Sequence, residues 1–268
     1  MKPSMTILVP LHNSKPFIEV VRRNILELSD DVRMIISDPF ENDETLTVLR
    51  TEFAHRQHVL FMGRRDIQPG WIPHYNDLLS RVKTKFFMWL AHDDEIDCSY
   101  LSICLGHLSN DPKLAGAVGD IEAVQGEGFL DSVQPEFPDS TTLANYQFFA
   151  NALLFEWNLG VLFRAVFRTK KVRPIKESFQ QDHWADIIWA YGLCLENRVM
   201  QDATAIYRKR FFVGSAHSKW QHHLYLSASL PYLAQQIDSS HLRRSERISS
   251  RAELLSGISR SLMGQISQ

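Results

Sequence analysis

Three consecutive carboxylates close a strongly apolar segment of the chain. Residues 86–90 are large and apolar and have the length of a buried strand, and they are followed by His92, Asp93, Asp94 and Glu95. Neighbouring carboxylates repel one another, so each must stay hydrated or meet a cation. Mg2+ usually takes one or two protein carboxylates and completes its shell with water and phosphate oxygens. The segment therefore predicts half of a divalent-cation site, with a plain polar turn as the alternative.

Further polar residues follow two other short apolar runs. Asp38 directly follows the apolar run at residues 32–37. Pro10 ends the first apolar run of the chain, and Asn13 lies in the loop after it. In a parallel sheet the carboxyl ends of the strands meet at one edge, and ligands bind there. We therefore expect Pro10, Asn13 and Asp38 to share one edge of a sheet with Asp93 and Asp94.

The elements that must position these side chains alternate along the chain. The apolar runs predict strands at residues 5–10, 32–37, 58–62, 86–91, 114–121 and 199–207. Amphipathic stretches predict helices at about residues 16–28, 45–53, 72–82, 99–109 and 185–195, and residues 221–268 form a largely helical extension. This alternation predicts an α/β fold, with a mostly parallel central sheet flanked by helices.

Composition limits the classes of function. The chain has 268 residues, 44% of them hydrophobic and 22% charged, and its formal net charge of -2 gives no reason to expect a nucleic-acid partner. No apolar run approaches the roughly 18 residues that cross a bilayer, so we expect a cytoplasmic protein. The arginines of the C-terminal extension favour a packed helix with a hydrated basic face, and peripheral contact with the inner face of a membrane is the alternative. Nothing in the sequence indicates an oligomeric state.

Later segments add candidate residues without a strong motif. Asp182 precedes a helix, so it could cap that helix or act as a base held by the positive helix end. A basic triplet that ends at Arg210 precedes a Gly-Ser loop with His217, which suits a phosphate and its metal. Trp157 and Asn158 could line a sugar-sized pocket, and core packing is the alternative for this aromatic segment.

Together, these blocks resemble the family 2 glycosyltransferases of the GT-A fold. The resemblance lies in residues 6–13 (TILVPLHN), 36–45 (ISDPFENDET) and 89–94 (WLAHDD), with Gln181-Asp182 similar to the family's Glu-Asp motif. Ala91 departs from the pattern, because many members have an aspartate there. The resemblance implies a GT-A domain over residues 1–220, in which residues 1–120 bind a nucleotide-sugar and residues 121–220 bind the acceptor.

The resemblance also implies roles for individual residues. Pro10, Asn13, Asp38, Asp93 and Arg210 would bind the nucleotide-sugar, Asp38 at the base and Arg210 near the phosphates.

Asp94 and His217 would ligate Mn2+ or Mg2+, and Asp182 would be the catalytic base. Trp157 and Asn158 would contact a saccharide or lipid-linked acceptor. The implied reaction is a metal-dependent, inverting transfer of a sugar to a hydroxyl, in the synthesis of a surface polysaccharide or glycoconjugate.

Two alternatives stay open. A nucleotidyltransferase on a similar fold usually carries a glycine-rich basic loop after the first strand, whereas residues 10–15 (PLHNSK) contain no glycine. A non-catalytic protein that binds nucleotide-sugars, or a scaffold, is compatible with the altered motif residues. No GxxxxGK[ST] or GxGxxG pattern occurs, which excludes P-loop and dinucleotide-binding motifs.

Overall fold

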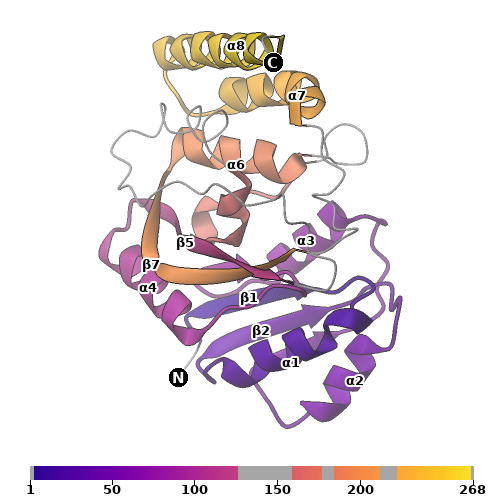
Figure 1. The fold of residues 1–268 in the computed structure, drawn as a ribbon. Coiled ribbons are helices and arrows are strands. Elements are labelled where there is room, and N and C mark those ends of the chain that lie inside the picture. The colour runs from indigo at the N-terminus through magenta and orange to yellow at the C-terminus, as the bar shows by residue number, and fades with distance from the viewer. Residues whose placement is uncertain (1–2, 126–158, 177–183, 212–221, 267–268) are drawn as a thin grey trace.

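The computed structural model describes residues 3–125, 159–176, 184–211 and 222–266 (Figure 1). The strands in these residues are β1 (Met5–Pro10), β2 (Val32–Ser37), β3 (Val59–Met62), β4 (Phe86–Trp89), β5 (Leu114–Gln125), β6 (Val166–Arg168) and β7 (Arg198–Phe211). They form one sheet in the order β3-β2-β1-β4-β6-β5-β7. Only β6 runs antiparallel to its neighbours, so the prediction of a mostly parallel sheet is confirmed.

Helices cover both faces of the sheet. They are α1 (Ile18–Glu27), α2 (Thr45–Glu52), α3 (Trp71–Ser80), α4 (Cys98–Asn110), α6 (Ala185–Glu196), α7 (His222–Ser239) and α8 (Arg244–Ile266), and 3₁₀ helices span Lys15–Phe17, Leu159–Arg164 and Thr169–Lys171. Buried residues of α1, α2 and α4 join one hydrophobic cluster, whereas those of α3 and α6 join the other. Figure 1 shows α6 on the side of the sheet opposite to α1 and α2.

The alternation of side chains along β4 explains how one short strand supports both clusters. Phe86 and Met88 belong to the cluster under α1, α2 and α4, whereas Phe87 and Trp89 belong to the cluster under α3 and α6. Successive side chains of a strand point to opposite faces, so a central strand between two helical layers must be apolar throughout.

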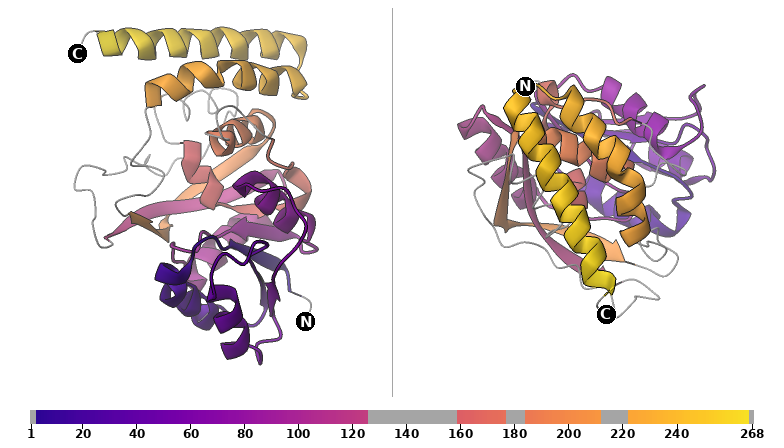
Figure 2. Two further views of the ribbon diagram at one scale, coloured as in Figure 1. Left: turned by 90° about the vertical axis from the view of Figure 1, so that its right-hand side faces the viewer. Right: turned by 90° about the horizontal axis from the view of Figure 1, so that it is seen from above.

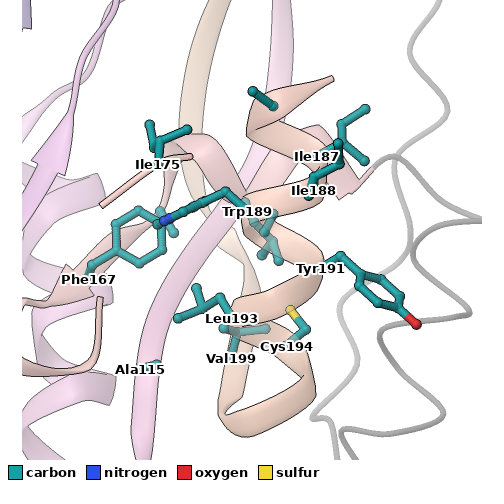
Figure 3. Packing of buried hydrophobic residues seen from close by; sticks show 14 of the residues in the cluster. Ala115, Phe167, Ile175, Ile187, Ile188, Trp189, Tyr191, Leu193, Cys194 and Val199 are labelled. Atoms are coloured by element: carbon teal, nitrogen blue, oxygen red, sulfur yellow. The ribbon is translucent and has the colours of Figure 1, made fainter. Parts of the chain in front are cut away.

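The face under α6 is rich in aromatic rings. Trp189 of α6 packs edge-on against Phe167 of β6 and against Trp89, with ring centroids 5.3 Å apart in both pairs. Figure 3 shows Trp189 pointing from α6 toward Phe167, and one turn further along α6 it shows Leu193 next to Val199 of β7. Such edge-to-face pairs add about 0.5–1.5 kcal/mol each beyond the burial of their area.

The two C-terminal helices stack on α6. Helix α7 contacts α6, and α8 contacts α7, so the three helices form successive layers above the sheet (Figure 1, Figure 2). Leu233, Ile237 and Leu254 of this extension belong to the same buried cluster as α6. No helix in the described residues is long and apolar enough to span a bilayer.

The predicted elements differ from the structure mainly near the second half of the sheet. The first two strands have the predicted bounds, whereas β5 and β7 are longer than predicted because they pair with each other as far as Gln125 and Phe211. The basic triplet at residues 208–210, which follows the predicted strand at 199–207, is part of β7. A 3₁₀ turn at Leu159–Arg164 and the short antiparallel strand β6 lie between β5 and β7 in the chain and have no counterpart among the predicted strands and helices.

A close backbone approach between β5 and β7 gives the first testable prediction. The register shifts between Gly119 and Asp120, and a Cβ atom at Gly119 would lie 1.9 Å from the carbonyl oxygen of Ala205. We expect Gly119→Ala to lower the free energy of unfolding by about 1–3 kcal/mol, as measured by urea denaturation.

Gly106→Ala is the matched control. Gly106 lies on α4 with no atom within 4 Å of an added Cβ, so alanine there should raise stability by about 0.5–1 kcal/mol. Equal effects of the two substitutions would contradict the steric explanation.

Candidate active site

A cavity of about 720 Å³ opens at the carboxyl edge of the parallel strands. Its walls come from the segments after β1, β2 and β4 and from the start of α3, and comprise residues 10–12, 40, 42, 69–71, 74, 75 and 91–93. The pairing of β1 with both β2 and β4 brings these segments together. The predicted gathering of residues at one edge is therefore present, but the individual side chains take different positions.

Asp38 lies under the cavity wall. It is only 1% exposed, and its carboxylate accepts hydrogen bonds from the backbone N–H groups of Phe40, Glu41 and Asn42 at 3.1, 2.8 and 3.2 Å. These bonds hold the loop that carries Phe40 and Asn42 into the cavity. The predicted contact of Asp38 with a base stays a prediction, and the structure adds that this carboxylate also supports the loop behind the cavity wall.

Asp94 is also buried, at 1% exposure, and it does not line the cavity. Its Oδ2 accepts a hydrogen bond from the hydroxyl of Tyr207 at 2.8 Å, and its Oδ1 accepts one from the backbone N–H of Arg210 at 3.0 Å. Arg164 Nε lies 3.9 Å from the same carboxylate. These contacts hold the carboxylate of Asp94 in place, and its role as a metal ligand stays a prediction.

Asp93 is the member of the acidic pair that faces the cavity. Burial and the nearby charge of Asp94 raise the pKa of its carboxyl group above the ordinary value. A cation bound at Asp93 would offset both effects, because it favours the ionised form.

Buried charges surround this pair. Burial lowers the pKa of Lys209 and raises the pKa of Asp186, and both residues interact electrostatically with Arg164. Lys209 also interacts with Asp93 and Asp94. Within the part of the chain that the structure describes, three carboxylates thus face the two cations Arg164 and Lys209.

Two histidines in the cavity wall are held by buried serines. Ser37 Oγ is 2.8 Å from Nε2 of His74, and Ser14 Oγ is 2.8 Å from Nδ1 of His92, whose ring also stacks on Phe17. Burial lowers the pKa of each histidine to about 4. Both rings are therefore neutral near pH 7.

The other predicted donor-binding residues lie near the cavity or outside it. Pro10 forms part of the wall, and Asn13 is hydrogen-bonded to the wall residue His12 through its side chain. The guanidinium of Arg210 pairs with Glu95 at 2.9 Å and does not line the cavity, and its contact with phosphates stays a prediction. The predicted positions Trp157, Asn158, Asp182 and His217 lie outside the described residues.

Sequence reasoning missed the contribution of α3. Trp71, His74 and Tyr75 line the cavity, and Tyr75 stacks on Phe163. The available signal was a histidine on the otherwise apolar face that Trp71 and Leu78 define. Within the described residues, no group of three histidine, cysteine or acidic side chains could hold a metal by itself.

Comparison with known families now decides the class of the protein. The family model described as "Glycosyl transferase family 2" matches residues 6–171, more than half of the chain. The chain belongs to this family. It is a glycosyltransferase, as the resemblance implied. No curated protein sequence matches the chain.

Solved structures agree on the fold. S. aureus TarS (residues 1–349) has a TM-score of 0.69 at 14% identity, over 96% of this chain and 71% of that chain. The same protein in complex with UDP-GlcNAc has a TM-score of 0.69 at 16% identity, over 96% and 72% of the two chains. The mannosyltransferase PcManGT from Pyrobaculum calidifontis, in complex with GDP-Man and Mn2+, has a TM-score of 0.55 at 13% identity, over 98% and 76%. The GT-A fold is therefore confirmed.

The buried His74 predicts a pH dependence of stability. Its pKa is about 4 in the folded protein against an ordinary value of 6.5, so the unfolded chain binds the proton more tightly. The free energy of unfolding should fall as pH drops from 6.5 to 4, by at most about 3 kcal/mol from this group. In His74→Gln this part of the loss should be absent, as urea denaturation at several pH values would measure. Parallel pH curves for the variant and the wild type would contradict the assignment.

Proposed function

We propose that the protein transfers a sugar from a nucleotide-diphosphate donor to an acceptor hydroxyl, with Mn2+ or Mg2+ as cofactor. The observation that carries the proposal is a cavity at the carboxyl edge of β1, β2 and β4 into which one acidic side chain, Asp93, faces. Structures of similar fold hold UDP-GlcNAc, or GDP-Man and Mn2+, which supports a donor of this class.

The residues present fit a divalent cation at Asp93. Mg2+ needs only one or two protein carboxylates when phosphate oxygens and water supply the remaining ligands. Asp93 meets this need, and His217 is a second candidate ligand. When bound, the cation would neutralise the negative charge that builds on the leaving diphosphate.

The charge balance near Asp93 supports the same cofactor. Arg164 and Lys209 already face the carboxylates of Asp93, Asp94 and Asp186, so they bring no net positive charge to a diphosphate. A donor bound here would be repelled unless a further cation came with it.

The chain's own residues would divide the remaining work. Asp93 would hold the cation beside the diphosphate end of the donor, and His12, Phe40 and Asn42 would enclose the rest of the nucleotide. Asp182 takes the proton of the acceptor hydroxyl, which attacks the anomeric carbon from the face opposite to the leaving group. This single displacement inverts the anomeric configuration.

The acceptor side of the site is proposed from the sequence. Trp157 and Asn158 would contact a saccharide or lipid-linked acceptor, and the product would belong to a surface polysaccharide or glycoconjugate. The enzyme would work in the cytoplasm, and its basic C-terminal helices would allow peripheral contact with the inner face of the membrane.

Substitution of Asp93 tests the metal-dependent step. We expect Asp93→Asn to lower metal-dependent release of nucleotide from the best donor by at least about 100-fold, because the diphosphate loses its link to the cation. The donor is found first by thermal-shift screening of nucleotide-sugars with Mn2+ and with EDTA.

Asp66→Asn is the control, since Asp66 is an exposed carboxylate that does not line the cavity. It should leave the rate unchanged. Full activity of Asp93→Asn, or no stabilisation by any nucleotide-sugar with metal, would contradict the proposal.

Substitution of Asp182 tests the assignment of the base. Asp182→Asn should keep donor binding and lower the rate of transfer by roughly 100- to 10,000-fold, the range that general-base catalysis supplies. Donor binding is measured by calorimetry and transfer by product analysis, in which NMR also reports the anomeric configuration. If Asp186→Asn alone abolishes transfer, the base is Asp186 and the assignment to Asp182 is wrong.

A further inference from the structure

The hydrogen-bonding state of His74 follows from the atoms around Ser37. Ser37 is fully buried, and its Oγ lies 2.6 Å from Nη2 of Arg65 and 2.8 Å from Nε2 of His74. A guanidinium is always a donor, so Ser37 accepts from Arg65. The hydroxyl proton of Ser37 needs an acceptor, and Nε2 of His74 is the one within reach among the described residues. His74 Nε2 is therefore unprotonated.

The neutral ring of His74 must then carry its proton on Nδ1. This atom makes no hydrogen bond within the described residues and is not one of the buried polar atoms left without a partner. Since the ring forms part of the cavity wall, the Nδ1–H group is a donor available to a ligand.

Arg65 fixes this arrangement from behind. Its guanidinium bonds to Asp77 at 2.9 and 3.1 Å and to the carbonyl oxygen of Gly63 at 2.7 Å. These contacts leave Arg65 little freedom, so Ser37 is held as an acceptor and His74 keeps a single tautomer. The donor is thus set before a ligand arrives.

The position of His74 indicates which part of a nucleotide it would meet. Ser37 ends β2, whereas Asp93 follows β4, and β1 lies between these two strands. Neighbouring strands are about 4.8 Å apart, so the two sides of the cavity are separated by about 10 Å. A donor with its diphosphate at Asp93 would place its base on the β2 side, beside Phe40 and His74.

We propose that His74 selects the base of the donor by donating its Nδ1–H to a carbonyl oxygen of uracil or guanine. This inference rests on the proposed function. Adenine has no carbonyl oxygen, and it would leave the His74 donor without a partner in a desolvated site.

The test compares UDP, GDP and ADP by calorimetry in the presence of Mn2+. The wild type should bind UDP or GDP more tightly than ADP. In His74→Phe, which keeps a planar ring but has no N–H, that preference should fall about three- to tenfold, the value of one hydrogen bond, while ADP affinity stays the same.

His107→Phe is the matched control. His107 lies on α4, where it is hydrogen-bonded to Asp202 of β7 at 2.6 Å, and it does not line the cavity. Replacing His107 should therefore leave the base preference unchanged. An unchanged base preference in His74→Phe would overturn this inference and leave the proposed function intact. If the wild type binds none of the three nucleotides, the proposed function fails and this inference fails with it.

A second measurement does not depend on the His74 variant folding. Nitrogen NMR of 15N-histidine-labelled wild type should show His74 protonated at Nδ1 in the free protein, and Ser37→Ala should shift it toward the other tautomer and reduce the base preference. Protonation of His74 at Nε2 in the wild type would overturn the inference.

Discussion

The loop after β4 is anchored to β7 by one buried carboxylate, and the rest of the site depends on this contact. Asp94 joins the hydroxyl of Tyr207 to the backbone N–H of Arg210, and the next residue, Glu95, exchanges backbone hydrogen bonds with Arg208. Removing one partner of such a buried network leaves an unsatisfied charge, which costs far more than a surface contact. The anchor explains why two adjacent aspartates differ: one secures the loop, and the other is left to face the cavity.

The same division between support and contact runs through the rest of the site. Asp38, Ser37 and Ser14 are buried and bonded to protein groups, and each holds a neighbouring residue that lines the cavity. Buried polar residues thus support the cavity wall from behind. Histidine and aromatic side chains supply much of the cavity lining itself.

The sequence was sufficient for the sheet and its functional edge, because both follow from local patterns. Apolar runs that end in polar residues mark β1, β2 and β4 directly. The sequence alone does not show which way each carboxylate points. Asp94, for example, is held inward by a hydrogen bond from Tyr207, which lies 113 residues further along the chain. The role of His74 was hidden for the same reason: its partners Ser37 and Arg65 come from two other segments. The contacts that separate a supporting residue from a contacting one are made by tertiary structure.

The stacking of α7 on α6 has a consequence for how much of the chain is needed to fold. Leu233 and Ile237 of α7 share one buried cluster with Trp189 and Leu193 of α6, and through Trp189 with the rings under the cavity. A shortened chain that ended before α7 would present this apolar surface of the catalytic domain to water. Such an exposed patch favours self-association. The two C-terminal helices thus act as an intramolecular cover for the apolar surface of α6.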